Sequence, residues 1–171
     1  LVLPPMVGGV ALLFLFGRTG WFGPLLLEGG IRVPFTTAAV VLAQSFVALP
    51  FLVLALESSL RTRGIGYEQT AAGLGSGRWR TLARVTLPLA APGLVAGIVL
   101  CFARAVGEFG ATALFAGNAP GVTRTMPLAI YTAFNGAGVS QGTAVALSLL
   151  LVVTAIVVLL CVRAWRPGAP R

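Results

Sequence analysis

The sequence contains no lysine, histidine or aspartate, and only four of its 171 residues are acidic. Without lysine or histidine, the chain cannot form a Walker A phosphate loop, a Schiff-base lysine, a Ser-His-Asp triad or a histidine metal site. We therefore expect no catalytic residue, no metal site and no cofactor in this chain, and no nucleotide hydrolysis by the chain alone. Cys101 and Cys161 lie inside apolar runs without a CxxC partner, which favours packed thiols over a disulfide.

Charge of either sign is scarce, whereas apolar residues are abundant. Charged residues make up 9% of the chain and apolar residues 57%, and the mean hydropathy is +0.97. A soluble domain carries roughly 25% charged residues, so this chain has too few to cover a globule in water. The net charge of +8 does not indicate nucleic acid as a partner, because the arginines punctuate apolar runs instead of forming a solvated patch. The composition predicts an integral membrane protein surrounded by lipid.

Long charge-free runs indicate where the chain crosses the membrane. A helix needs about 20 residues to cross roughly 30 Å of hydrocarbon. We predict an all-α, polytopic helical bundle that forms a single transmembrane domain over 1–171. Its membrane helices are expected at about 1–16, 36–56, 87–107 and 142–163, and the first of these is short for a crossing. The stretch 126–134 predicts a short outer helix that cannot span.

The arginines are distributed unevenly between the two predicted sides of the membrane. Eight lie in the loop 57–86 or in the C-terminal tail, namely Arg61, Arg63, Arg78, Arg80, Arg84, Arg163, Arg166 and Arg171. Three lie on the other side, namely Arg18, Arg32 and Arg124. Because cytoplasmic loops carry the excess of arginine, we expect the loop and the C-terminus to be cytoplasmic in a multi-pass plasma (inner) membrane protein.

The loop 57–86 is far longer than a connection between two membrane helices requires. Its segment 68–72 favours a short helix, Gly75 and Gly77 end that helix, and 78–82 favours a second helical piece. Small side chains at Ala71 and Ala72 give a smooth face that can enter a groove on another protein. An ordinary solvated basic loop is the alternative that this pattern alone leaves open.

Several motifs give the chain a family resemblance. One motif begins in the loop and has the pattern E-x-A-A, then G, then (I/V)-x-L-P. Its residues here are Glu68, Ala71, Gly75 and the segment Val85-Thr86-Leu87-Pro88, and Thr70 stands where an alanine is usual. Four stretches extend the match, namely 1–5 (LVLPP), 68–88, 102–112 (FARAVGEFGAT) and 115–131 (FAGNAPGVTRTMPLAIY). The chain resembles the permease subunits of ABC importers, and more closely their molybdate permeases.

This resemblance implies a fold and a set of partners. The fold is that of type I ABC importer permeases, which have five or six membrane helices, so one or two N-terminal helices are expected to be missing here. The partners are a second permease copy in a homodimer, two ATP-binding cassette subunits that bind ATP-Mg, an extracytoplasmic oxyanion-binding protein and membrane lipid. An isolated fragment that begins at the third of six helices is not expected to transport.

The resemblance also implies which residues couple this chain to its ATPase. The loop forms a coupling helix that docks in a cleft of the ATPase, with contributions from Glu68, Ala71, Ala72, Gly75, Leu87 and Pro88. Glu68 suits the N-terminal half of that helix, where the macrodipole favours a carboxylate. Gly75 is expected to end it with a positive φ, and Leu87-Pro88 to stiffen the return into the membrane.

Arg104 and Glu108 are the charges that interrupt the apolar runs, and their spacing of four residues allows them to pair. An intramembrane charge costs roughly 2.5–3.5 kcal/mol and is a functional hypothesis by default. One interpretation is that they line a translocation path or gate together with Phe109, Thr112 and Asn118, because weak neutral donors suit a dianion that must not be trapped. The other is that both side chains snorkel to the outer interface.

We therefore predict a permease subunit of an ATP-driven importer for molybdate or tungstate, without an ATPase site of its own. Sulfate is the alternative substrate within the same family. A stand-alone channel or a structural membrane subunit is the alternative of a different class, although a channel has no use for a docking helix. An intramembrane enzyme would need paired carboxylates, a Ser/Lys dyad or histidine ligands, which the apolar runs lack.

Overall fold

The computed structural model describes residues 4–136 and 140–164, and every regular element in these ranges is helical. In chain order the elements are α1 (Pro5–Phe16), α2 (Gly23–Glu28), α3 (Thr37–Arg63), α4 (Gly66–Gly73), α5 (Arg78–Thr81), the π-helical turn η1 (Leu82–Thr86), α6 (Leu87–Val106), α7 (Gly110–Phe115), α8 (Met126–Phe134) and α9 (Gln141–Ala164). The prediction of an all-α membrane fold is confirmed over the part of the chain that is described.

Three helices within these ranges are long and apolar enough to cross a membrane, namely Thr37–Arg63, the continuous helical run Arg78–Val106, and Gln141–Cys161. The 12-residue helix α1 measures about 18 Å, which is less than the roughly 30 Å of hydrocarbon. Helix α8 has the bounds predicted for the short outer helix. Residues 1–3 of the predicted first helix and the tail arginines Arg166 and Arg171 lie outside the described residues.

The second membrane helix is longer than the sequence predicted. Helix α3 continues seven residues beyond the expected end at position 56, because its last turns carry an ion pair between Glu57 and Arg61 (2.8 Å) and no helix breaker. Gly64, with a φ of 68°, then ends the helix. Of the predicted loop 57–86, only residues 64–77 lie outside the long helical runs, and these include α4.

The third membrane helix has a local irregularity at its entrance. Pro88 has no N–H group, so the carbonyl of Arg84 cannot accept an α-helical hydrogen bond from it. The chain forms the π-helical turn η1 at this position, in which the N–H of Leu87 donates to the carbonyl of Leu82. Helices α5, η1 and α6 thus form one continuous rod that carries the loop into the membrane helix.

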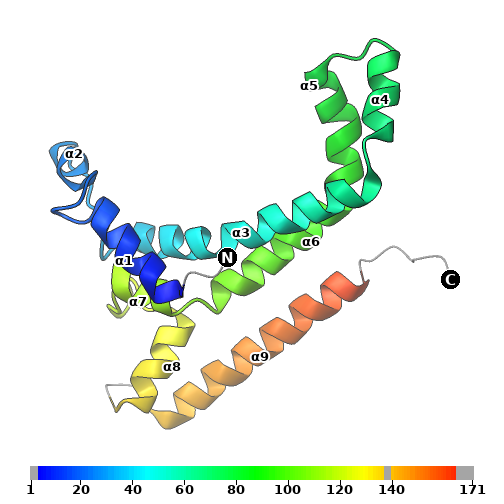
Figure 1. The fold of residues 1–171 in the computed structure, drawn as a ribbon. Helices are drawn as coiled ribbons and strands as arrows, with labels where there is room; N and C mark the ends of the chain where they lie inside the picture. The colour runs from blue at the N-terminus through cyan, green and yellow to red at the C-terminus, as the bar shows by residue number, and fades with distance from the viewer. Residues whose placement is uncertain (1–3, 137–139, 165–171) are drawn as a thin grey trace.

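Helices α3 and α6 run side by side along the molecule, with α4 and α5 at one end and α1, α2 and α7 at the other (Figure 1). Their contact relies on small residues. A Cβ added at Gly93 would lie 2.1 Å from the Ser59 hydroxyl, and one at Gly97 would lie 3.0 Å from the Ala55 methyl. Such close approach is typical of membrane helices, which associate by packing and not by burial from water.

The buried core lies at the end of the molecule opposite α4. It consists of Leu12, Val33, Ala39, Ala43, Ala111, Phe115 and Ala116, contributed by α1, the segment before α3, α3, α7 and the residue after α7. Helix α7 packs so closely on α1 that a Cβ at Gly9 would lie 2.8 Å from the Cα of Ala111. The short helices α2 and α7 were not predicted from the sequence.

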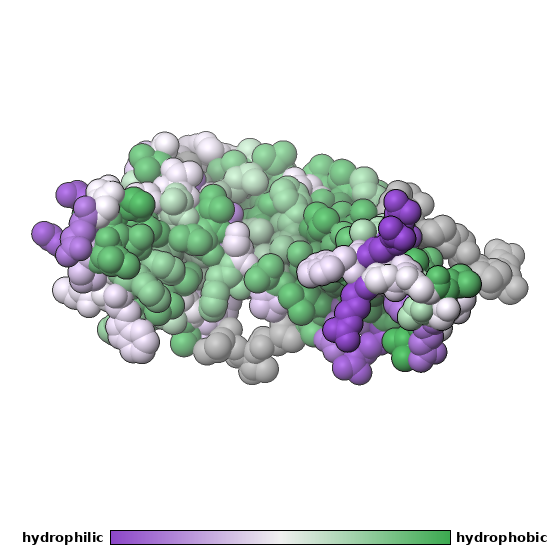
Figure 2. All heavy atoms as spheres, turned by 90° about the horizontal axis from the view of Figure 1, so that it is seen from above, coloured by the Kyte–Doolittle hydropathy of each residue, from purple (hydrophilic) through white to green (hydrophobic). Residues whose placement is uncertain are grey.

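Hydrophilic side chains gather towards the two ends of the molecule. Figure 2 shows apolar side chains over the middle of the visible face, with hydrophilic ones concentrated at the α4–α5 end and at the opposite end. Most large side chains of α9 are exposed, among them Leu149, Val153 and Leu159. An apolar band between two polar ends is the surface that a bilayer-spanning protein presents.

Candidate functional site

The first candidate site is the helical hairpin formed by α4, α5 and η1 beyond the membrane helices. Gly75 has a φ of 80°, which agrees with the positive φ expected there. The N–H of Ser76 donates to the carbonyl of Ala71 (3.0 Å), and that of Gly75 to the carbonyl of Ala72 (2.9 Å). These two bonds form a Schellman motif, which satisfies the carbonyls at the C-terminus of α4 and turns the chain towards α5.

Glu68 links the two arms of this hairpin. It lies in the first turn of α4, where the helix dipole favours a carboxylate. Its Oε1 accepts a hydrogen bond of 3.0 Å from the hydroxyl of Thr86, eighteen residues later in η1. Its Oε2 is buried and has no partner among the described residues. The bond places α4 against the rod that leads through Leu87 and Pro88 into α6.

The outer surface of the hairpin is apolar at several points although it extends beyond the membrane helices. Tyr67 is 60% exposed, Leu74 85% and Trp79 84%, and the side chain of Ala72 is exposed as well. Helix α4 buries none of its residues. Large apolar side chains exposed on one hairpin are typical of a surface that another protein covers.

The second candidate site surrounds the intramembrane charge pair at the end of α6. Arg104 Nη1 lies 2.7 Å from Glu108 Oε2, so the two residues pair as their spacing predicted. Glu108 Oε1 accepts a hydrogen bond of 2.9 Å from the N–H of Ala111 in the first turn of α7. Both carboxylate oxygens are therefore occupied, and the carboxylate connects the end of α6 to the start of α7.

The burial of the pair is strongly unequal. The side chain of Glu108 is 1% exposed, whereas that of Arg104 is 28% exposed. A carboxylate buried to this extent is not snorkelling, so this structure does not support that interpretation for Glu108. Arg104 is the member of the pair that another molecule can reach.

Two further predicted residues lie on either side of Ala111. The ring of Phe109 lies 5.1 Å from that of Tyr131, centroid to centroid, which links the start of α7 to α8. Thr112 is fully buried, and its hydroxyl has no hydrogen-bond partner among the described residues. The structure thus brings Arg104, Glu108, Phe109 and Thr112 together around the junction of α6 and α7.

Asn118 belongs to a different hydrogen-bond network. Its Nδ2 donates to the hydroxyl of Thr132 (2.7 Å), and its Oδ1 accepts from Arg124 Nε (2.9 Å). The hydroxyl of Thr123 also accepts a hydrogen bond from the N–H of Ala119 (2.9 Å). This network fastens the segment after α7 to α8, and its members Arg124 and Thr132 were not predicted as site residues. The sequence signal that could have identified Arg124 and Thr132 is the presence of polar residues in the otherwise apolar stretch 115–132.

No metal site is found among the described residues, where no group of three potential ligands comes together. Cys101 and Cys161 are both free thiols. The arginine, hydroxyl, amide N–H and backbone N–H groups around α7 and α8 can donate hydrogen bonds to an anion.

Comparison with known proteins gives a consistent result. A family model described as "Binding-protein-dependent transport system inner membrane component" matches residues 1–168. The chain is 56% identical to the "Molybdenum transport system permease protein ModB" of Mycobacterium tuberculosis, over 98% of this chain and 62% of that protein. It is 45% identical to the protein of the same name from Escherichia coli K12, over 84% of this chain and 63% of that protein.

A more distant relative is named for a different substrate. The chain is 43% identical to "Sulfate permease 2, chloroplastic" of Chlamydomonas reinhardtii, over 77% of this chain and 36% of that protein. The chain spans slightly less than two thirds of the length of each of the two molybdenum permeases.

Proposed function

Because the chain belongs to the family of binding-protein-dependent transport system inner membrane components, we propose that it forms part of the permease of an ATP-driven importer for molybdate or tungstate. The observation that carries this proposal is the hairpin at α4, which has an exposed apolar surface outside the membrane helices and is closed by the Glu68–Thr86 bond. The names of the relatives with 56% and 45% identity support molybdate as the substrate.

Coupling to ATP requires other subunits in this proposal. The sequence has no lysine and therefore no Walker A loop, so ATP-Mg is bound by two separate ATP-binding cassette subunits. Helix α4 docks on one of them, and the hydrogen bond between Glu68 and Thr86 passes its movement to the rod of α5, η1 and α6. A second permease copy and an extracytoplasmic oxyanion-binding protein complete the importer, which lies in the plasma (inner) membrane with the α4 hairpin and C-terminus in the cytoplasm.

The junction of α6 and α7 is the proposed path or gate. Arg104 offers a cation that a dianion can reach, while Glu108 holds that cation in place and reduces its attraction. A site of this kind binds weakly, as conduction requires. Phe109 contributes an aromatic wall at the junction, the buried Thr112 supports it from behind, and Asn118 holds the segment after α7 in place through its own network. Selectivity between oxyanions is then set largely by the separate binding protein.

Two alternatives give different results in one experiment. The full-length permease is reconstituted with its ATPase and binding protein, and uptake of labelled molybdate is measured per assembled complex. The proposal expects uptake that requires ATP and that falls severalfold in Arg104→Gln. Uptake without ATP supports a stand-alone channel, and equal competition by sulfate supports the sulfate permease alternative.

A further inference from the structure

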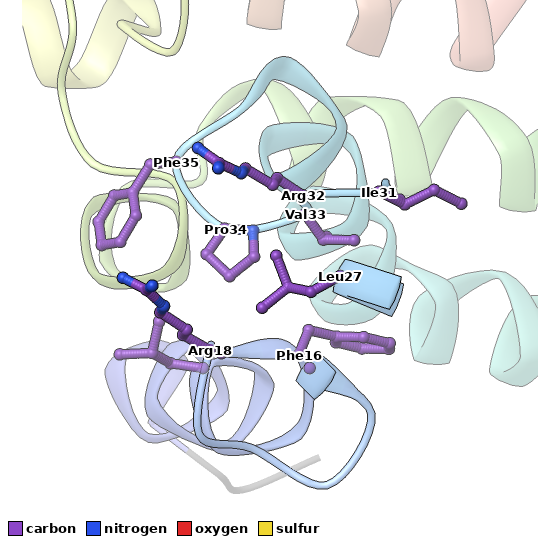
Figure 3. A pocket seen from close by; sticks show the side chains of 11 residues that line it. Phe16, Arg18, Leu27, Ile31, Arg32, Val33, Pro34 and Phe35 are labelled. Carbon is purple, nitrogen blue, oxygen red and sulfur yellow. The ribbon is translucent and has the colours of Figure 1, made fainter. Parts of the chain in front are cut away.

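A cavity of about 520 Å³ lies at the end of the molecule opposite α4 and belongs to neither candidate site. Its walls come from the C-terminus of α1, from α2 and from the segment 31–35 before α3. Figure 3 shows the guanidinium groups of Arg18 and Arg32 on the same side of the cavity as Phe35, with Phe16 and Leu27 on the opposite side. The cavity is mainly apolar, has two cations at its edge, and falls within the size range of ligand sites, about 300–1,000 Å³.

The two arginines have no acidic partner in the part of the chain that is described. The ion pairs there join Arg61 to Glu57 and Arg104 to Glu108. Two unpaired cations beside an apolar cavity match a ligand that has an anionic group attached to an apolar chain. A fully hydrated oxyanion satisfies the arginines but gains nothing from the apolar walls.

The position of the cavity indicates the source of such a ligand. Arg18 follows α1 and Arg32 precedes the first spanning helix, α3, and Figure 1 shows α1 and α2 at the end of the molecule opposite the α4 hairpin. Trp21 and Leu25, which lie in the chain between the lining residues Arg18 and Leu27, are 87% and 68% exposed, and tryptophan is enriched at the level of the lipid headgroups. Arginine guanidinium groups form strong, often bidentate hydrogen bonds with phosphate, which an anionic headgroup supplies.

We propose that this cavity binds an anionic phospholipid, with the phosphate between Arg18 and Arg32 and one acyl chain against Phe16 and Leu27. The lipid belongs to the leaflet opposite the α4 hairpin. The proposal requires the chain to lie in a membrane and does not depend on the identity of the transported anion, so it can fail while the proposed transport function holds.

Trp21 is a natural reporter for this site. In the full-length protein, every other tryptophan is replaced by phenylalanine, and the protein is reconstituted with brominated phosphatidylglycerol or brominated phosphatidylcholine. Quenching of Trp21 fluorescence then measures the relative affinity of the two lipids. Two arginines acting together are expected to favour phosphatidylglycerol by up to about thirtyfold.

Three variants test the two arginines and the apolar wall of the cavity separately. Arg18→Gln combined with Arg32→Gln should remove the preference, while Arg63→Gln at the opposite end should leave it unchanged. Leu27→Phe narrows the part of the cavity where the acyl chain would lie and retains both cations, so it should reduce the preference severalfold while the protein still elutes as a single assembled species.

Three outcomes would contradict the binding of an anionic phospholipid in this cavity. If the full-length protein shows no preference for phosphatidylglycerol, the remainder of the chain or another subunit covers the cavity, and the proposal is wrong. An unchanged preference in Leu27→Phe means that the arginines attract anionic lipid without using the cavity, which also contradicts it. Loss of the preference on adding inorganic phosphate alone identifies a simple anion site instead of a lipid site.

Discussion

At the scale of single residues, burial distinguishes two ion pairs that share the same spacing along a helix. Glu57–Arg61 and Arg104–Glu108 have the same spacing and nearly the same contact distance, 2.8 and 2.7 Å. The side chains of the first pair are 48% and 80% exposed, whereas Glu108 is 1% exposed and also accepts the Ala111 N–H. Water replaces the lost partner in the first pair but cannot reach the carboxylate in the second.

This difference predicts unequal effects of the same substitution. Arg104→Ala leaves the buried carboxylate of Glu108 without its cation and should lower the free energy of unfolding by about 3–5 kcal/mol. Arg61→Ala removes an exposed pair and should change it by no more than about 0.5 kcal/mol. Thermal unfolding of the full-length protein in detergent measures both. Equal, small effects would show that Glu108 is reached by water or by another cation in the complete protein.

At the scale of secondary-structure elements, the contact of α3 with α6 depends on a glycine facing a small side chain. Gly93→Ala adds a methyl group at a position 2.1 Å from the Ser59 hydroxyl and 2.2 Å from its Cβ, but 3.7 Å from its Cα. The overlap should lower stability by about 1–3 kcal/mol. Replacing Ser59 by glycine in the same protein removes both clashing atoms and should restore stability.

Rescue of Gly93→Ala by Ser59→Gly tests whether these two residues are in contact. Measured by thermal unfolding, the double variant should be more stable than Gly93→Ala alone. Failure of Ser59→Gly to improve the variant would place the clash elsewhere and contradict the close approach of the two helices.

The C-terminus of α4 is a second element whose geometry predicts a result. Gly75 and Gly73 both have open space around them, but only Gly75 has a positive φ. Gly75→Ala should therefore raise the backbone energy of the Schellman turn by about 1–2 kcal/mol, because alanine adopts a positive φ unfavourably. Alanine at Gly73 lies in regular helix and should be neutral or favourable by up to about 1 kcal/mol.

Coupling is the readout for this pair of variants. In the assembled importer, substrate-stimulated ATP hydrolysis should fall in Gly75→Ala and remain normal in Gly73→Ala, with equal membrane insertion of both. Normal coupling in Gly75→Ala would argue against a role for the shape of this turn in docking to the ATPase.

At the scale of the whole molecule, the predictable features are those that a local stretch of sequence determines. The apolar runs that became α3, α6 and α9 are each about as long as a bilayer is thick, so composition alone locates them. The positive φ of Gly75 follows from residue type, because glycine adopts it without a Cβ penalty.

The remaining features depend on contacts between distant residues. Helix α7 has six residues, too few to be stable alone, and it forms because Ala111 and Phe115 are buried against α1 and α3. Asn118 joins residues six and fourteen positions away, with no sequence period to indicate it. The cavity at Arg18 and Arg32 likewise arises from three segments, none of which forms it alone.

Orientation in the membrane is a property of the whole chain and yields the last prediction. The loop 57–86 and the tail carry eight arginines, and the opposite side carries three, so the α4 hairpin should face the cytoplasm. Leu74 is 85% exposed in this hairpin, and Ala119 is exposed in the segment between α7 and α8. In a protein whose Cys101 and Cys161 are replaced by alanine, Leu74→Cys should react with an impermeant thiol reagent only from the cytoplasmic side, and Ala119→Cys only from the other side. Reversed labelling would overturn the docking of α4 on a cytoplasmic ATPase, because the hairpin would then lie where no ATP is supplied.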